Sequence, residues 1–215
     1  MQTAERPQRK AASRKKVERP EMAEMPAPVW ESALRPLKGR PNLSFLHVGA
    51  GDGRLTGWFL NNVLTDATSR MICIDTWEGD LEQQVGGADM EAIRAEFVRQ
   101  MEPHGDRVEI LLARSQEVLR DLSHDSYEAF DLAYVGGSQI ASDVLEDAVL
   151  AFRLVRKYGI IVFDGVEQHP FGGNPLLEPK LGVTAFRAAF AGQYEPLYEG
   201  EQLVLRKLRS GIDAM

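Results

Sequence analysis

The sequence predicts an α/β protein built on one doubly wound sheet, with an antiparallel pair of strands at the end of the chain. Three observations predict this fold. Short apolar runs alternate with segments of helical spacing, and each run is apolar at consecutive positions, as is typical of strands covered on both faces. Finally, the last two strand-like runs lie only a tight turn apart. Alternation of strand and helix places the strands in one sheet with helices on both faces.

The expected parallel strands are five short apolar runs. They are residues 43–50, 70–75, 108–113, 130–135 and 159–164. Between them, apolar residues at helical spacing predict helices over 55–63, 90–101 and 145–155. Ser142 is the expected N-cap of the third helix, and Gly159 is its expected terminator.

The end of the chain departs from this alternation. A helix is expected over 183–190, and it leads to two strand-like segments, YEPLY and QLVLRKL, which are separated by the turn EGE. Segments this close predict a hairpin. The expected order is therefore five crossover strands followed by a terminal hairpin.

Composition divides the 215 residues into a tail and one domain. Residues 1–27 hold seven Lys or Arg, four Glu and almost no large apolar side chain, which predicts a disordered basic tail. Residues 28–215 are expected to form a single domain. Without the tail, the totals of 25 basic and 32 acidic residues fall to 18 and 28, so this domain carries a net charge near −10.

Charge and hydropathy exclude several classes of partner. An acidic domain argues against nucleic acid as the main partner. No signal-peptide pattern is present and no apolar run reaches the length of a membrane span, so a cytoplasmic protein without a membrane partner is expected, and a homo-oligomer stays open. The single cysteine, Cys73, excludes an internal disulfide and is expected to be a core residue rather than a nucleophile.

A glycine loop follows the first expected strand. The segment HVGAGDGR places Gly49, Gly51 and Gly53 between a strand and a helix, where a ligand can approach the backbone, although a tight turn can also use glycine for geometry alone. A dinucleotide fingerprint requires Gly or Ala at the position of Arg54. The loop therefore indicates a ligand site without indicating a nicotinamide cofactor.

Polar and aromatic residues follow the second and third expected strands. Asp75 can accept the two hydroxyls of a ribose or can merely form a turn. Trp77 can cover an adenine face or can pack half-buried against the protein, and the sequence favours neither. Ser115 is either a helix N-cap or a hydroxyl near the base.

Six blocks in one order carry a resemblance to a known family. They are VGAGDGRLT from position 48, IDTWEG from 74, ARSQEVL from 113, YVGGSQ from 134, VLEDA from 144 and YGIIVFDG from 158. Over residues 43–207 the chain resembles the class I S-adenosylmethionine-dependent methyltransferases, in particular a small bacterial branch. The resemblance implies a Rossmann-like seven-stranded sheet with a C-terminal antiparallel hairpin, and S-adenosyl-L-methionine as the cofactor.

The same resemblance implies a set of cofactor contacts. The loop glycines would lie against the amino acid part of the cofactor, Asp75 on its ribose, and Trp77 and Ser115 near its adenine. The full expected set of cofactor-binding residues is Gly49, Gly51, Asp52, Gly53, Asp75, Thr76, Trp77, Ser115 and Gly136.

The catalytic half of the pattern departs from the family. Similar metal-assisted O-methyltransferases hold a cation with an Asp after the fourth strand and two ligands after the fifth, whereas the matching residues here are Gly136, Asp164 and Gly165. Since a hard cation needs several oxygen ligands, no metal site is expected. The family pattern has a histidine, a natural general base, at the position of Gln139. His47 lies where the first motif of the family commonly has an acid.

The sequence thus predicts a metal-independent methyltransferase acting on a small-molecule hydroxyl acceptor. Asp164 and His169 are the expected catalytic residues because ligands lie at the carboxyl ends of such strands, with Glu167 and Gln139 as weaker candidates. The alternative is an inactive methyltransferase-like protein that serves as a cofactor-binding or partner-interaction module. An NAD-dependent dehydrogenase is disfavoured by Arg54 and by the terminal hairpin.

Overall fold

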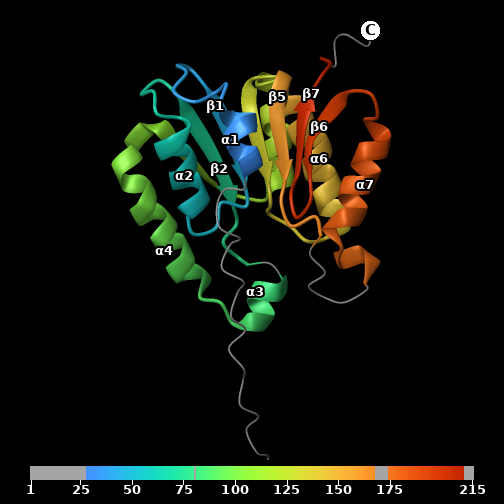
Figure 1. Ribbon diagram of the computed structural model, residues 1–215. Helices are drawn as coiled ribbons and strands as arrows, with labels where there is room; N and C mark the ends of the chain where they lie inside the picture. The colour runs from blue at the N-terminus through green and yellow to red at the C-terminus, as the bar shows by residue number, and fades with distance from the viewer. Residues whose placement is uncertain (1–27, 80, 168–173, 211–215) are drawn as a thin grey trace, which may run out of the picture.

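The computed structural model describes residues 28–79, 81–167 and 174–210, which form a central sheet between two layers of helices (Figure 1). The tail over residues 1–27 lies outside this part of the chain. The strands are β1 Ser44–Val48, β2 Arg70–Asp75, β3 Val108–Leu112, β4 Phe130–Val135, β5 Val155–Phe163, β6 Tyr194–Glu199 and β7 Leu203–Lys207. The helices are α1 Pro28–Leu34, α2 Arg54–Asn62, α3 Leu81–Gly86, α4 Met90–Met101, α5 Ser115–Asp125, α6 Ala141–Leu154 and α7 Pro179–Ala189, with 3-10 helices at Glu102–Arg107 and Pro175–Leu177.

The seven strands lie in the order β3-β2-β1-β4-β5-β7-β6. The first five run parallel, and β7 pairs antiparallel with both β5 and β6. The predicted doubly wound, Rossmann-like sheet with its terminal hairpin is therefore confirmed. The order reverses between β1 and β4, and open α/β sheets bind their ligands at such a switch point, beyond the carboxyl ends of the strands.

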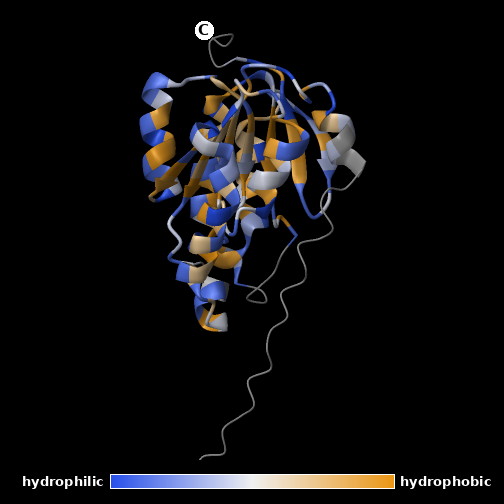
Figure 2. Cartoon of the chain, turned by 90° about the vertical axis from the view of Figure 1, so that its left-hand side faces the viewer, coloured by the Kyte–Doolittle hydropathy of each residue, from blue (hydrophilic) through white to orange (hydrophobic). Residues whose placement is uncertain are grey.

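Alternate residues of the strands supply two separate hydrophobic cores. Phe45 and Tyr134 pack with the apolar faces of α1, α2 and α4, whereas Leu46 and Val135 pack with those of α5, α6 and α7. Successive side chains of a strand point to opposite faces, so an almost fully apolar strand serves both layers. Figure 2 shows the apolar strands between helices whose outer faces are hydrophilic. None of the helices in the described ranges has the length and hydropathy to cross a membrane.

The junction between α6 and β5 differs from the sequence-based expectation. The helix begins at Ala141, so Ser142 lies in its first turn rather than at the N-cap, which is Ile140. The helix ends at Leu154 and β5 starts directly at Val155, so Gly159 lies within the strand. A β-bulge or irregularity interrupts the pairing of β4 with β5 there. The polar residues Arg156 and Lys157 interrupt the apolar run at the same place, so the sequence predicted the strand only from residue 159.

Candidate functional site

The loops that follow β1, β2, β4 and β5 meet at one edge of the sheet, the lower edge in Figure 1, where α3 also lies. Parallel pairing brings their carboxyl ends to this edge: Val48 pairs with Ile74 and Val135, and Val135 pairs with Phe163. The residues predicted from the glycine loop, from IDTWEG, from YVGGSQ and from Asp164 are therefore neighbours in space.

Glycine is required at position 49 because the backbone of the loop after β4 lies directly against it. Gly49 has a φ of +84°, and a Cβ at this position would lie 2.6 Å from the Gly137 Cα atom and 2.7 Å from the Gly136 carbonyl oxygen. Real side chains do not tolerate such distances against backbone atoms. The loop after β1 and the loop after β4 are thus packed against each other through glycine alone.

Gly51 and Gly53 have different surroundings although they lie two residues apart. Both have positive φ angles, +56° and +88°. A Cβ at Gly51 would meet no atom within 4 Å, whereas one at Gly53 would lie 3.0 Å from Cδ2 of Phe97 on α4. Gly53 therefore serves the packing of α4, and Gly51 presents bare backbone to open space at the strand ends.

Asp75 and Trp77 tie the loop after β2 to the glycine loop. The Asp75 carboxylate accepts hydrogen bonds from the backbone N–H of Gly51, at 2.9 Å, and of Trp77, at 2.7 Å. The Trp77 indole N–H donates to the Gly51 carbonyl oxygen at 2.9 Å. The Trp77 side chain is only 6% exposed and packs on Phe97 with ring centroids 5.2 Å apart. This burial favours the packing interpretation of Trp77 over an adenine-covering one.

Asp52 and Thr76 make local contacts at the surface of the same edge. Asp52 accepts from the backbone N–H of Arg54 at 3.1 Å and forms an ion pair with its guanidinium at 2.7 Å. The Thr76 hydroxyl accepts from the backbone N–H of Glu78 at 3.2 Å. Both interactions shape turns, one in the glycine loop and one in the loop after β2.

Ser115 is the first residue of α5, and its hydroxyl donates to the Asp147 carboxylate at 2.9 Å. Asp147 is buried, and its second oxygen, Oδ1, has no hydrogen-bond partner among the described residues. The sequence analysis missed Asp147, although an acid on the apolar face of α6, between Val144 and Ala148, was a visible signal. Asp147 thus fixes the position of Ser115 from the neighbouring helix.

Burial raises the pKa of Asp147 from 3.8 to about 7, partly offset by the Ser115 hydrogen bond. In the folded protein this group retains its proton at pH values where the unfolded chain has released it. Its contribution to stability is therefore full below pH 3.8, declines as the pH rises, and is lost above about pH 7.

His47 lies within β1 beneath the glycine loop. Its Nδ1 atom shares a hydrogen bond of 2.8 Å with the Thr56 hydroxyl, and its ring meets Tyr134 edge-on at 5.1 Å. Complete burial lowers the pKa of His47 from 6.5 to about 3, so the ring is neutral near pH 7. Its contribution to stability is present above pH 6.5 and is lost as the pH falls toward 3.

Asp164 directly follows β5, and a network that the sequence analysis missed holds its side chain. The Gln202 side-chain amide donates to Oδ1 of Asp164 at 2.9 Å and to the Tyr134 hydroxyl at 3.3 Å, while its oxygen accepts from the Trp30 indole at 2.7 Å. Burial and the nearby Asp164 carboxylate raise the pKa of Tyr134 well above 10. Helix α1 is thereby linked through Gln202 to the tip of β5.

A small pocket of about 50 Å³ lies beside Asp164. Its lining consists of Gly136, Gly137, Ser138, Gln139, Asp164, Gly165 and Pro179. A Cβ at Gly136 would stand 3.3 Å from the Asp164 Cβ and 3.8 Å from its Oδ2. Residues 136 and 164, which match metal-ligand positions of similar enzymes, are therefore neighbours in space.

The remaining catalytic candidates do not complete a metal centre in the described part of the chain. Within it, no three His, Cys, Asp or Glu side chains cluster in a way that could hold a metal ion. Glu167 is exposed and forms an ion pair with Lys180 at 2.8 Å. His169 lies outside the described residues.

This strand order, with a glycine loop after β1 and an acid after β2, defines the class I S-adenosylmethionine-dependent methyltransferase fold. A family model described as a methyltransferase domain matches residues 46–166, and the chain therefore belongs to this family of methyltransferases. A comparison with curated protein sequences gives no match.

Solved structures share this fold at low sequence identity. One is an O-methyltransferase from Bacillus cereus in complex with S-adenosylhomocysteine, which is 15% identical over 87% of this chain and 84% of its own, with a TM-score of 0.61. Another is TomG, an O-methyltransferase from Streptomyces achromogenes involved in tomaymycin synthesis, in complex with S-adenosylmethionine; it is 18% identical over 86% of this chain and 81% of its own, with a TM-score of 0.60. Both likenesses support the family assignment at the level of the fold.

Proposed function

We propose that the protein is an S-adenosylmethionine-dependent methyltransferase that methylates a hydroxyl group of a small molecule without the help of a metal ion. The observation that carries this proposal is the arrangement at the switch point of the sheet. Bare backbone at Gly51 and the carboxylate of Asp75 lie at the same edge as the single carboxylate of Asp164 and its small pocket. The cofactor would supply an electrophilic methyl group on a sulfonium centre.

The residues around Gly51 and Asp75 fit S-adenosylmethionine. An ionised carboxylate offers about four lone-pair sites, and the two backbone N–H groups bound to Asp75 occupy two of them. Two sites therefore stay available for ribose hydroxyls. At Gly51 the space is free of protein atoms within 4 Å of a would-be Cβ, so the methionine part of the cofactor could approach the backbone closely.

Asp164 is the proposed general base. Gln202 holds Oδ1 with a neutral amide and the Tyr134 hydroxyl also interacts with this carboxylate, whereas Oδ2 faces the side of Gly136 and the pocket. A hydroxyl group held there could release its proton to Oδ2 as the oxygen attacks the methyl group. His169 is retained as a second candidate for the same proton.

A divalent cation does not fit this set of residues. Gly136 and Gly165 offer no side-chain oxygen, and one aspartate with a glutamine-held oxygen is a poor site for a strongly hydrated ion. The proposal therefore includes no step through a metal. The acidic composition of the domain agrees with a small-molecule acceptor rather than a nucleic acid, and a cytoplasmic location is proposed on the same grounds of composition as above.

Calorimetry with S-adenosylmethionine and S-adenosylhomocysteine, with and without magnesium, is the direct test. We expect saturable binding of both that magnesium does not tighten, and methylation of members of a phenol panel that EDTA does not reduce. Asp164→Asn keeps the oxygen that Gln202 contacts, so S-adenosylhomocysteine should bind within twofold of the native affinity while turnover falls by about 10²–10⁴-fold. Asp121→Asn, at an exposed carboxylate on α5, is the matched control.

The inactive alternative has its own supporting observation. The acid side chains of the site are already hydrogen-bonded within the protein, Asp75 to two backbone N–H groups and Asp164 to Gln202. Cofactor binding without methylation of any acceptor in a broad panel would favour this alternative. Absence of cofactor binding would overturn the proposed enzyme and leave only the partner-interaction form of the alternative.

A further inference from the structure

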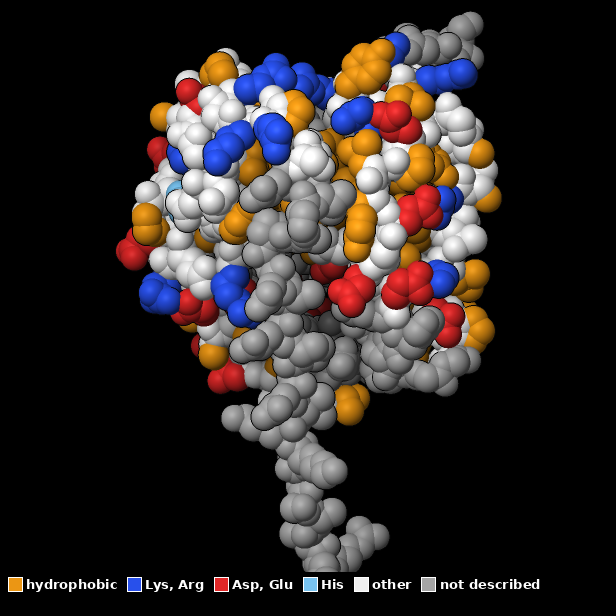
Figure 3. Space-filling model, in the orientation of Figure 1, with side chains coloured by type: hydrophobic (Ala, Val, Ile, Leu, Met, Phe, Trp, Pro, Cys, Tyr) orange, Lys and Arg blue, Asp and Glu red, His pale blue; other side chains and the backbone are white. Residues whose placement is uncertain are grey.

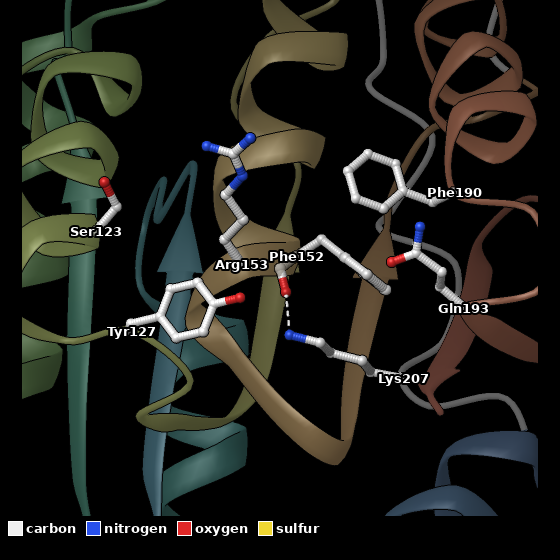
Figure 4. A pocket seen from close by; sticks show the side chains of 7 residues that line it. All are labelled: Ser123, Tyr127, Phe152, Arg153, Phe190, Gln193 and Lys207. Carbon is white, nitrogen blue, oxygen red and sulfur yellow. Dashed lines mark hydrogen bonds between the residues drawn. The ribbon is translucent and has the colours of Figure 1, made fainter. Parts of the chain in front are cut away.

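A second, larger pocket lies at the edge of the sheet opposite the candidate active site. It has a volume of about 320 Å³ and lies where α6 ends, β5 begins and β7 ends. Its lining consists of Ser123, Tyr127, Phe152, Arg153, Phe190, Gln193 and Lys207 (Figure 4). The strands separate it from the cofactor loops, because the six residues of β4 alone span about 20 Å at roughly 3.3 Å per residue.

The floor of this pocket is rigid and its charge is already balanced. The Lys207 ammonium donates to the carbonyl oxygens of Phe152, at 2.9 Å, and Val155, at 2.7 Å, and pairs with Glu128 at 2.8 Å. These three contacts use its three donors. Lys207 is only 2% exposed and braces the turn between α6 and β5, so it is not available to a ligand.

The walls, in contrast, carry polar groups without partners among the described residues. The Arg153 guanidinium, the Tyr127 hydroxyl and the Gln193 side-chain amide form no hydrogen bond or ion pair there. Figure 4 shows Arg153 and Tyr127 on one side of the pocket and the Phe190 ring and Gln193 on the other. Tyr127 is 41% exposed, and its ring lies 5.8 Å from the Lys207 ammonium, so its hydroxyl can be reached from solvent at the rim of the pocket.

We propose that this pocket binds a small aromatic carboxylate. A guanidinium binds a carboxylate through two parallel hydrogen bonds, and Arg153 is the unpaired guanidinium at the pocket wall. The rings of Tyr127 and Phe190 border the pocket and can contact a flat apolar body, while the Tyr127 hydroxyl and the Gln193 amide can donate to further polar groups of the ligand.

Surface charge supports an anionic ligand at this edge. Figure 3 shows several Lys and Arg side chains gathered along the upper edge of the molecule, whereas Asp and Glu side chains gather lower, toward the candidate active site. Arg209, two residues beyond β7, likewise has no carboxylate partner in the described ranges. A protein of net charge −7 thus presents a locally basic edge to an approaching anion.

The test uses 2-naphthoate as the probe, titrated into the full chain by calorimetry or ligand-observed NMR. We expect saturable binding that saturating S-adenosylhomocysteine changes by less than twofold, and at least tenfold weaker binding of uncharged 2-naphthamide. Arg153→Gln should weaken 2-naphthoate at least tenfold, and Tyr127→Leu at least threefold. Arg99→Gln, an exposed arginine on α4 that pairs with Glu96, is the matched control and should leave the affinity unchanged.

Three results would overturn the proposal. These are no saturable binding of 2-naphthoate, equal affinity of the Arg153→Gln variant at an unchanged melting temperature, and displacement of 2-naphthoate by S-adenosylhomocysteine, which would place the probe in the cofactor site. Because none of these measurements requires methyl transfer, failure of this proposal and failure of the proposed function are distinguishable.

Discussion

Alanine substitutions at Gly51 and Gly53 should separate cofactor binding from folding within one loop. Both residues have positive φ angles, so a Cβ at either position costs about 1–2 kcal/mol of backbone strain. At Gly51 that is the whole cost to the unliganded protein, since no atom lies within 4 Å of the new methyl group. At Gly53 the methyl group would lie 3.0 Å from the Phe97 ring and 3.3 Å from the Met101 methyl group.

The two costs differ by the overpacking at α4. Forcing a methyl group into a filled site typically costs 1–3 kcal/mol, and in a domain of this size each kcal/mol lowers the melting temperature by about 2–4 °C. Gly53→Ala should therefore melt roughly 2–12 °C below Gly51→Ala. For S-adenosylhomocysteine the order reverses: Gly51→Ala should bind at least about tenfold more weakly, a loss of about 1.4 kcal/mol, and Gly53→Ala within threefold of the native affinity.

Differential scanning calorimetry without ligand and titration calorimetry at a temperature where both variants are folded measure the two effects. Native affinity in Gly51→Ala would show that the space in front of this glycine does not belong to the cofactor. Equal melting of the two variants would refute the packing role assigned to Gly53.

Four further predictions concern the candidate site and its surroundings. Asp75→Asn turns one acceptor toward a backbone N–H into a donor and should weaken S-adenosylhomocysteine by about 10–100-fold in calorimetry, and native affinity would refute the ribose role. In urea unfolding, the free energy of unfolding of Asp147→Asn, relative to that of the native protein, should be about 3 kcal/mol higher at pH 8 than at pH 5, because the carboxyl group with the raised pKa is gone. His47→Gln should lose less stability than the native protein as the pH falls below 6.5. For either variant, a pH profile identical to that of the native protein would contradict the assignment. Gly136→Asp places a second carboxylate beside Asp164 and should create Mn²⁺ binding, detectable by electron paramagnetic resonance, that Gly136→Ala lacks.

The fold was predictable from the sequence because each strand contributes side chains to both hydrophobic cores and is therefore apolar at consecutive positions. Strands with apolar residues at consecutive positions indicated a sheet covered on two faces, and the short EGE turn indicated the antiparallel end, as the β6–β7 pairing confirms. The spatial order of the strands and the short helix α1 left no such pattern. The early start of β5 was also hidden, since Arg156, Lys157 and Tyr158 interrupt its apolar run.

The candidate site was predictable where a residue type is tied to a backbone requirement, and less so where side chains meet across the fold. Gly49 has the positive φ that its motif suggested, and the group that approaches it closely is the backbone of the loop after β4. Gln202, by contrast, lies in a polar turn 38 residues after Asp164, and only the pairing of β5 with β7 brings them together. The partnership of Ser115 with Asp147 likewise depends on how α5 and α6 pack.

The glycine contact between the loops after β1 and β4 has a consequence for changing the acceptor. Because a Cβ at Gly49 would overlap backbone atoms of Gly136 and Gly137, any side chain at position 49 would displace the loop after β4. Ser138 and Pro179 also line the small pocket beside Asp164. For the proposed acceptor site, substrate engineering should therefore begin with these two residues, where a new side chain changes the lining while Gly49 is retained.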